Sequence, residues 1–375
     1  MPPAEISALA LQLLPNFSHR SRLNIFKNFE CFSSIEAAQP SQLRELMSAE
    51  TLRAWCSYKS GRGEHFDKVR REWELSQQHD IQLLSIESEL YPKLLKESCD
   101  APLLLYVRGD VNTLGLPQVA VIGARKASPT GRALAAEFAA ELACRGYVVT
   151  SGLALGIDSE AHRGALNAAC AGPLAQGAAT IAVLGSGLLK PYPQRNTALL
   201  ESIVQQGGAV VSEQPLKMAA LSHHFPLRNR IIVGLSIATL VVEAALKSGS
   251  LISARLALEM DRELFAIPGS IRSELSRGCH QLIKQGAALV ESVDDILTNL
   301  SHWQPWFQQQ LFAEEAQEQL EGRQRQVLES VGWELSSIDT VLERSQLSLA
   351  ELSEVLLELE LSGHIENTGM GYVRL

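Results

Sequence analysis

One segment, from Val119 to Asp158, constrains the fold of this chain more than any other. In it a short apolar run, Val119 to Ile122, ends at Gly123, and a helix-like segment follows. A second apolar run, residues 147–150, ends at Ser151-Gly152, where another helix begins. Strand, glycine turn and helix in this order predict a parallel βαβ unit. Both turns then lie at the carboxyl ends of strands, where free N–H groups and helix N-termini favour phosphate.

The same alternation continues to about residue 300. Apolar runs occur at residues 119–122, 147–150, 180–184, 209–211, 238–242, 264–267 and 288–290, with helical patterns in most of the gaps. Near-continuous apolar strands separated by helices predict a parallel sheet that is covered on both faces. We therefore expect a Rossmann-like, doubly wound, mostly parallel α/β domain over residues 81–300. A further apolar run, residues 103–107, is expected as an edge strand of this sheet.

The flanking parts have different patterns. Residues 1–80 predict an all-α module of the SAM or helix-hairpin-helix kind, whose hairpin, Asn16-Phe17-Ser18, lacks a glycine. A packing or interaction role for this module is therefore favoured over direct contact with DNA. Residues 301–322 are rich in Gln and Glu and are expected as a linker. Residues 323–375 predict three helices and a small hairpin, which is a winged-helix pattern.

Composition indicates an ordinary globular protein. The chain has 375 residues and a formal net charge of −9, but residues 118–300 alone carry 16 basic and 14 acidic side chains. The acidity therefore lies outside the central domain, which leaves room for a local basic groove there. No apolar run approaches the roughly 18 residues of a membrane span, and the N-terminus lacks the basic region of a signal peptide. We expect a cytoplasmic protein with no membrane contact, and six reduced cysteines.

Two nucleotide-binding motifs are missing from the sequence. No G-x-G-x-x-G fingerprint follows the first strand, and no acidic residue follows at the usual ribose position. A G-x-x-x-x-G-K-[ST] loop is also missing. A nicotinamide enzyme and a P-loop ATPase are therefore disfavoured, and we expect no cofactor and no metal site.

Glycine, serine, basic and aromatic residues gather after the strands instead. Glycine and serine let a backbone approach a ligand closely, arginine pairs with phosphate oxygens, and aromatic rings stack on unpaired bases. Because these turns share one edge of the sheet, they predict a ligand groove. Its candidate contacts are Gly123, Ala124, Arg125, Lys126, Ser151, Gly152, Leu153, Gly185, Gly187, Lys190, Tyr192, Arg195, Phe225, Arg228, Asn229, Arg230, Ser248 and Gly249.

Three carboxylates near this groove raise the question of catalysis. Glu213 and Glu243 are expected to pair with Arg228 or Arg230, and Asp158 to stabilise a helix N-terminus. No set of nucleophile, base and orienting group is recognisable, so structural roles are favoured. A hydrolase of nucleotides or nucleoside phosphates, with Glu213 or Glu243 as general base, is the alternative from another class. The third candidate function is that of a purely structural adaptor for recombination proteins.

The order of these motifs resembles a known family. The chain is similar to the DNA-processing protein A (DprA/Smf) family over about residues 91–300. The resemblance rests on Tyr91-Pro92, Val121-Ile122-Gly123-Ala124-Arg125, Ser151-Gly152-Leu153-Ala154, Gly156-Ile157-Asp158, Ala161-His162, Val183-Leu184-Gly185, Tyr192-Pro193, Ser212-Glu213, Phe225-Pro226, Arg228-Asn229-Arg230, Ser248-Gly249-Ser250 and Pro268-Gly269.

The resemblance implies a recombination mediator rather than an enzyme. Such proteins bind incoming single-stranded DNA in natural transformation, protect it, load the RecA recombinase and displace single-strand-binding protein, usually as homodimers. The family's Gly-[Ser/Thr]-Arg phosphate loop corresponds to Gly123-Ala124-Arg125, and its second loop to Ser151-Gly152-Leu153.

This chain departs from the family pattern at three positions. Ala124 replaces a hydroxyl residue, Leu155 replaces a common arginine, and Gln194 replaces a basic residue that Lys190 or Arg195 could supply. Residues 169–178 also read as an insertion before the third strand.

The would-be recognition helix of the winged-helix module is unusually acidic. It contains Glu351, Glu354, Glu358 and Glu360 and neither Lys nor Arg. Phosphates would repel such a helix, so a protein-contact role is favoured over duplex reading.

Overall fold

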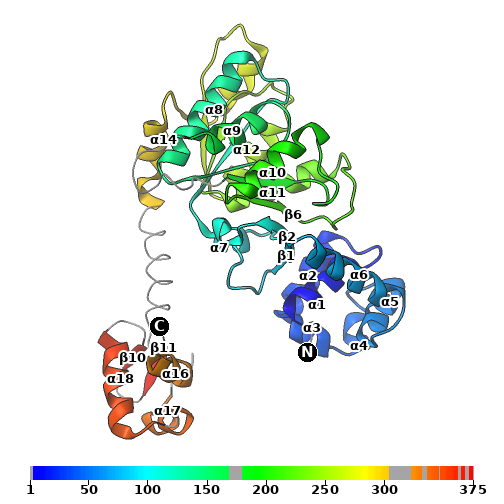
Figure 1. Ribbon diagram of the computed structural model, residues 1–375, viewed down its shortest axis with the longest axis vertical. Helices are drawn as coiled ribbons and strands as arrows, with labels where there is room; N and C mark the ends of the chain where they lie inside the picture. Colours follow the sequence, from blue (N-terminus) through cyan, green and yellow to red (C-terminus); the bar gives the residue numbers. More distant parts are fainter. Residues whose placement is uncertain are drawn as a thin grey trace. The chain divides into compact units, whose positions relative to one another are not determined.

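The computed structural model of the chain describes residues 3–168, 180–303, 322–331, 336–345, 347–361, 365–367 and 371–374 (Figure 1). It divides into two compact units, Met1–Ser301 and His302–Leu375. The first contains a helical module and a large sheet, and the second a small helical domain. The insertion expected at residues 169–178 lies outside the described residues. Within the described residues, no helix is both long and apolar enough to cross a membrane.

The large sheet confirms the expected doubly wound architecture. Its nine strands are β1 (Ile81–Ser85), β2 (Leu104–Gly109), β3 (Gln118–Ile122), β4 (Val148–Ser151), β5 (Thr180–Leu184), β6 (Ala209–Ser212), β7 (Ala238–Val241), β8 (Glu263–Ala266) and β9 (Ala288–Leu289). Their spatial order is β1-β2-β6-β5-β4-β3-β7-β8-β9. Strands β3 to β9 pair in parallel, whereas β1 and β2 are antiparallel additions at one side. The central strands are buried along their length, as continuous apolar runs require.

The expectation that residues 103–107 form an edge strand is wrong. Strand β2 lies between β6 and β1, and β1 occupies the edge. Sequence inspection missed β1 because its five residues, IQLLS, follow a long helix and lack strict alternation.

Helices cover both faces of the sheet. They are α8 (Pro129–Cys144), α9 (Ile157–Leu166), α10 (Thr197–Gln205), α11 (His224–Leu235), α12 (Ser250–Glu259), α13 (Arg277–Lys284) and α14 (Val293–Leu300). Helices α8, α9 and α10 connect strands that step one way across the sheet, whereas α12 and α13 connect strands that step the other way. Right-handed crossovers therefore place the two groups on opposite faces.

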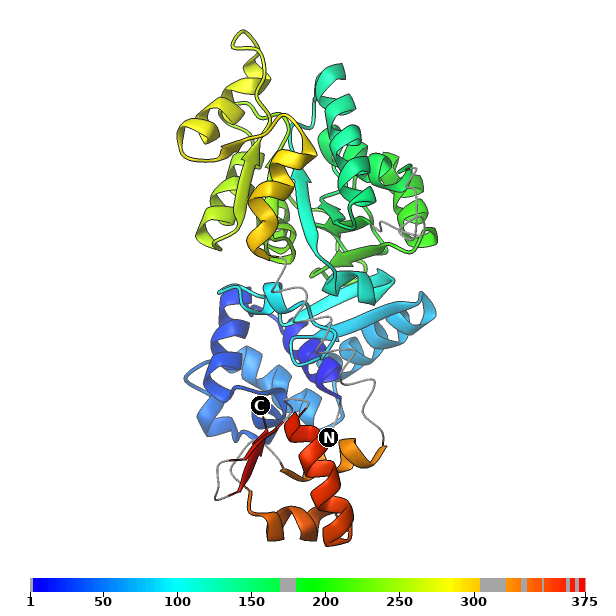
Figure 2. The same cartoon turned by 90° about the vertical axis from the view of Figure 1, so that its left-hand side faces the viewer.

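The helices of the N-terminal module share one apolar core with the sheet domain (Figure 2). It contains α1 (Ala4–Gln12), α2 (His19–Phe29), α3 (Phe32–Ala37), α4 (Pro40–Leu43), α5 (Ala49–Lys59) and α6 (Glu64–Gln78), and a short α7 (Lys93–Lys96) precedes β2. Trp55, Leu9 and Ile25 are fully buried. Ser18 begins α2 as an N-cap, its hydroxyl accepting from Ser21 N at 3.2 Å.

The second unit has the expected winged-helix elements. Helices α16 (Gly322–Val331), α17 (Ile338–Ser345) and α18 (Leu349–Leu361) precede the antiparallel pair β10 (Ile365–Asn367) and β11 (Tyr372–Arg374). Val327, Val341, Leu352 and Leu356 belong to its separate core.

Cysteine pairing differs from the expectation of six reduced thiols. Cys144 is disulfide-bonded, whereas Cys31, Cys56, Cys99 and Cys279 are free. Spacing along the sequence shows no C-x-x-C pair and could not reveal which cysteine Cys144 meets in space.

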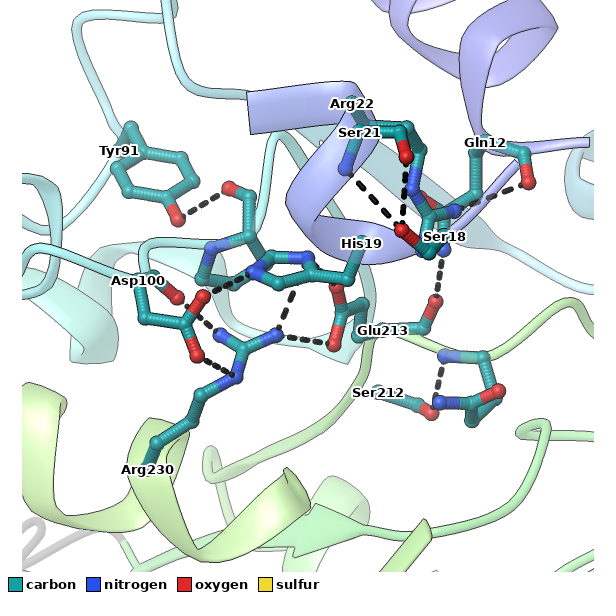
Figure 3. A network of polar contacts seen from close by, with 12 residues as sticks. Gln12, Ser18, His19, Ser21, Arg22, Tyr91, Asp100, Ser212, Glu213 and Arg230 are labelled. Atoms are coloured by element: carbon teal, nitrogen blue, oxygen red, sulfur yellow. Dashed lines mark hydrogen bonds and ion pairs between the residues drawn. The ribbon is translucent and has the colours of Figure 1, made fainter. Parts of the chain in front are cut away.

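A buried cluster of charged groups joins the helical module to the sheet (Figure 3). Arg230 of α11 donates through Nη2 to Glu213 Oε2, and its Nε lies 3.2 Å from Asp100 Oδ2. His19, at the start of α2, lies between the same carboxylates, with Nε2 2.6 Å from Asp100 Oδ1 and Nδ1 2.9 Å from Glu213 Oε1. Gln12 Nε2 donates to the Glu213 carbonyl at 2.6 Å. Glu213, directly after β6, therefore contacts both the helical module and helix α11.

Charge in this cluster changes the protonation of its members. Burial alone would raise the pKa of Glu213, but Arg230, His19 and Arg22 together lower it to about 2. Burial would likewise lower the pKa of His19, but its bonds to Asp100 and Glu213 outweigh this and raise it. The cluster therefore holds two carboxylates as anions and favours the imidazolium form of His19.

Replacing Glu213 with Gln should lower the free energy of unfolding of the first unit by about 3–5 kcal/mol, because Arg230 and His19 would lose their shared buried counter-ion and keep only the more exposed Asp100. The matched control is Glu201→Gln. Glu201 pairs with Arg108 at 2.7 Å, but both side chains are 30% exposed or more, so the control should lose only about 0–1 kcal/mol. Urea unfolding of both variants measures the difference, and equal losses would contradict the assigned role of Glu213.

The stabilising contribution of His19 should depend on pH. Because its folded-state pKa is raised, this contribution is complete below the ordinary value of about 6.5 and is lost as the pH rises through the folded-state pKa. His19→Gln should therefore lower the free energy of unfolding, relative to the wild-type protein, by more at pH 6 than at pH 9. A difference that does not change between these two pH values would show that His19 stays neutral in the fold.

Candidate nucleic-acid interface

The parallel strands bring several turns to one edge of the sheet. Strands β5, β4, β3 and β7 are neighbours, so the turns after them lie side by side. From β3 the chain first steps towards β6 and later returns to β7 on the other side. Such a reversal opens a crevice at the carboxyl ends of the strands, which is where ligands bind in doubly wound folds.

The turns after β3 and β4 hold each other by close backbone contacts. Ile157 N, at the start of α9, donates to Ala124 O at 3.2 Å. Gly156 has φ +86°, and a Cβ there would meet Ala124 O at 2.3 Å, so only glycine fits. A Cβ on Gly123 would lie 2.5 Å from Ile157 Cγ1. The two predicted phosphate loops therefore form one connected backbone surface.

Three predicted contact residues meet above this surface. The Arg125 guanidinium lies 5.1 Å from the centre of the Phe225 ring, within cation–π range. The Phe225 and Tyr192 rings are 5.7 Å apart and tilted by 54°. Tyr192 is 50% exposed, and Phe225 is partly buried. We call Arg125, Phe225 and Tyr192 the stacking strip. It combines a cation for phosphate with aromatic faces for unpaired bases.

The structure corrects the expectation that Arg228 and Arg230 contact DNA. Arg228 is 6% exposed and donates through Nη1 to Val183 O at 3.1 Å. It lies directly under the turn after β4, because a Cβ on Gly152 would be only 1.4 Å from its Nη1. Arg230 is 4% exposed and belongs to the charged cluster with Glu213. Both arginines therefore support the site from inside the protein.

Asp158 and Arg228 influence each other beneath the same turn. Burial lowers the pKa of Arg228 to about 10, with Arg125 adding to the shift and Asp158 opposing it. Burial also raises the pKa of Asp158, although Arg228 and an N–H of Ala154 oppose this. A cation this far inside the protein sets a positive potential under the loops without contacting solvent.

Other predicted contacts are buried as well. The Ser151 hydroxyl donates a hydrogen bond to Val121 O at 2.6 Å. Leu153 is fully buried and has φ +55°. A Cβ on Gly187 would lie 2.1 Å from Pro215 O. Ala124 and Gly185 are also buried. These residues shape the turns, and only their backbones can take part in binding.

The remaining predicted residues are at least partly accessible, but they do not all gather at the strip. Lys126, Lys190, Arg195 and Gly249 are exposed, whereas Gly123, Asn229 and Ser248 are partly buried. Arg195 lines a separate depression between α9 and α10 together with Arg163 and Asn167. Ser248 Oγ accepts from Ser250 N at 3.2 Å at the start of α12.

Glu243 does not form the predicted arginine pair. Its carboxylate accepts from Ser128 N at 2.9 Å and from Ser128 Oγ at 2.6 Å, and so fixes the start of α8. Glu213 does pair with Arg230, as predicted. Asp158 lies in the first turn of α9, also as predicted.

Two positioning residues were not among the predicted contacts. Asn196 donates through Nδ2 to Leu153 O at 2.8 Å, tying the turn after β4 to the segment before α10. His19 and its neighbours fix α11, the helix that carries Phe225. No short sequence motif marks either role, because the partners are 43 or more residues away in the chain.

Two family models match most of this chain, and several known proteins are similar to it. The family model described as "DNA recombination-mediator protein A" matches residues 82–301, and "DprA winged helix domain" matches residues 313–369. Protein Smf of Escherichia coli is 44% identical over 302 residues, covering 80% of this chain and 79% of that protein. The DNA processing protein DprA of Streptococcus pneumoniae is 44% identical over 213 residues, covering 57% of this chain and 72% of that protein.

Two solved structures are similar as well. The X-ray structure of DNA processing protein A from Streptococcus pneumoniae has a TM-score of 0.67 at 32% identity, covering 80% of this chain and 98% of that one. A Helicobacter pylori structure, described by its single-stranded DNA binding mode, has a TM-score of 0.51 at 31% identity, covering 59% and 96%. Together with the turns, the sheet order and the winged-helix unit, these matches show that the chain belongs to the DNA recombination-mediator protein A (DprA/Smf) family.

Proposed function

We propose that this protein binds single-stranded DNA along the carboxyl edge of its parallel sheet. The observation that carries the proposal is the stacking strip, in which Arg125, Phe225 and Tyr192 lie together beside the backbone turns after β3 and β4. Bases stack on the two rings, while phosphates bind Arg125 and the turns. The single-stranded DNA binding described for the Helicobacter pylori relative supports the same ligand.

The direct contacts in this proposal are the accessible side chains and the backbone groups of the turns. They are the side chains of Arg125, Lys126, Lys190, Tyr192, Arg195, Phe225 and Asn229, with the backbones of Gly123, Ala124, Gly152, Ser248 and Gly249. Ser151, Leu153, Gly185, Gly187, Arg228 and Arg230 hold this surface in shape. Because Ala124 has no hydroxyl, Arg125 takes a larger share of phosphate binding.

We further propose the biological role that family membership suggests. In it the protein protects incoming DNA during natural transformation, loads RecA and displaces single-strand-binding protein, acting as a homodimer in the cytoplasm. Membership of a recombination-mediator family supports this role.

A hydrolase that uses the same groove is the weaker alternative. Its two candidate bases already have partners, because Glu213 pairs with Arg230 and Glu243 accepts from Ser128. A carboxylate that is held in this way is poorly placed to activate water. We therefore propose a non-catalytic role, and product release from free nucleotide would argue for the alternative. A structural adaptor would instead bind neither nucleotide nor DNA.

Replacing Arg125 or Phe225 with Ala should weaken oligo-dT binding by about 1–3 kcal/mol in each case. Only Arg125→Ala should also reduce the slope of affinity against salt, because it removes a phosphate contact. Arg145→Ala is the matched control, since Arg145 is an exposed arginine after α8, at the opposite edge of the sheet. Filter binding at two salt concentrations measures the oligo-dT affinity of all three variants. Wild-type affinity in folded Arg125→Ala would remove Arg125 from the site.

The winged-helix unit is proposed to contact protein. On α18, Glu354, Leu357 and Glu360 are exposed. Deletion of residues 317–375 should leave the affinities for single- and double-stranded DNA within about twofold of wild type, because such a surface repels phosphate. Gel-shift titration with both ligands tests this, and a large loss for either would assign DNA binding to the unit.

A further inference from the structure

An apolar pocket opens on the helical module, outside the DNA surface described above. Its volume is about 640 Å³, and α1, α5, α6 and β1 all line it. Phe66, Val69 and Trp73 face it from α6, at the spacing of one helical face. Val69 is buried, but Trp73 remains 42% exposed. Aromatic surface of this kind in a hollow is typical of binding sites.

The pocket reaches around the edge of the large sheet. Strand β1 is the last strand on its side and pairs with β2 alone among the described strands. Gln82 and Leu83 both line the pocket. Since successive side chains of a strand point to opposite faces, a hollow that touches both lies along the free edge of β1.

The backbone of this edge is open for pairing at Leu83. Ile86 N donates to Leu103 O at 3.0 Å, so these two residues form a hydrogen-bonded pair of the ladder. In an antiparallel ladder the hydrogen-bonded residues alternate along each strand. The N–H and C=O groups of Ser85 and Leu83 therefore point away from β2. Ser85 O accepts instead from Ser88 N at 2.9 Å, as this alternation requires. For Leu83, the described part of the chain supplies no partner on the outer side. An open edge of this kind is a template for β-strand addition.

The pocket lining carries one basic side chain, Arg70, and one carboxylate, Glu5. The side chain of Arg70 is 58% exposed, and its acidic neighbours, Asp67 and Glu74, approach only to 3.9 Å. Glu5, the acidic residue of the lining, accepts from Ser85 Oγ at 3.2 Å. Arg70 can therefore bind a carboxylate of an incoming molecule.

We propose that β1 and this pocket bind an extended acidic and apolar peptide segment of a partner protein. The peptide adds a strand to β1 at Leu83, inserts an aromatic or aliphatic side chain beside Phe66 and Trp73, and pairs a carboxylate with Arg70. A second copy of this chain fits less well, because β1 itself, IQLLS, contains no acidic residue. The proposal does not depend on DNA binding by the sheet edge.

Selection of a random nonapeptide phage library on the full-length protein tests the proposal. Enriched peptides should combine an aromatic or aliphatic residue with Asp or Glu. In fluorescence anisotropy they should bind Arg70→Glu and Trp73→Ala at least tenfold more weakly than wild type. The matched control, Arg71→Glu, reverses the neighbouring exposed charge on α6, which does not line the pocket, and should bind as wild type does.

A charge reversal makes the test specific. Replacing the acidic residue of the peptide by Lys should restore binding to Arg70→Glu, and bound peptide should shift the amide resonance of Leu83. The absence of enriched peptides, or equal affinity for wild type and Arg70→Glu, would overturn the proposal. A dimer that Trp73→Ala abolishes, and that no selected peptide displaces, would place a second copy on this surface and overturn it too. Oligo-dT affinity should be unchanged in Arg70→Glu, so this result is independent of the DNA proposal.

Discussion

The buried ion pair between Arg230 and Glu213 fixes the helix on which the proposed DNA surface depends. Glu213 follows β6, and Arg230 lies on α11, five residues after Phe225. His19 and Gln12 of the helical module contact the same glutamate. Because a buried charge without a partner is costly, module, strand and helix are held in one arrangement. The module therefore has a positioning role even without contacting DNA.

The site is built in two layers with different tasks. An inner layer of buried polar groups holds the turns: Arg228 lies under Gly152, Asn196 ties down Leu153 O, and Glu243 fixes the start of α8. An outer layer, the stacking strip and nearby lysines, faces solvent. Glycines at the interface between the layers are required because a Cβ would collide with the inner groups. The inner layer therefore determines the shape of the turns, and the outer layer contacts the ligand. The outer layer suits a ligand with both phosphates and bases.

The sequence predicted the fold well where patterns are local. Near-continuous apolar runs located the parallel strands of the sheet, and spacing located the winged-helix elements. It was less informative about burial. Arg228 and Arg230 read as DNA contacts. The pair of Glu213 with Arg230 was predicted, but nothing in the neighbourhood of these arginines shows that Val183 O and Asp100 surround them as well. Strand β1 was missed because five residues carry too little periodicity. Long-range pairing, such as His19 with Asp100, has no local signature at all.

The central claim is that single-stranded DNA lies on the stacking strip. A crystal structure with a short oligo-dT tests it most directly. We expect a thymine ring against Phe225 or Tyr192, and phosphates within hydrogen-bond distance of Arg125 and of backbone N–H groups in the turns after β3 and β4. An oligonucleotide bound to another face of the protein, with Arg125, Phe225 and Tyr192 left in solvent, would contradict the account.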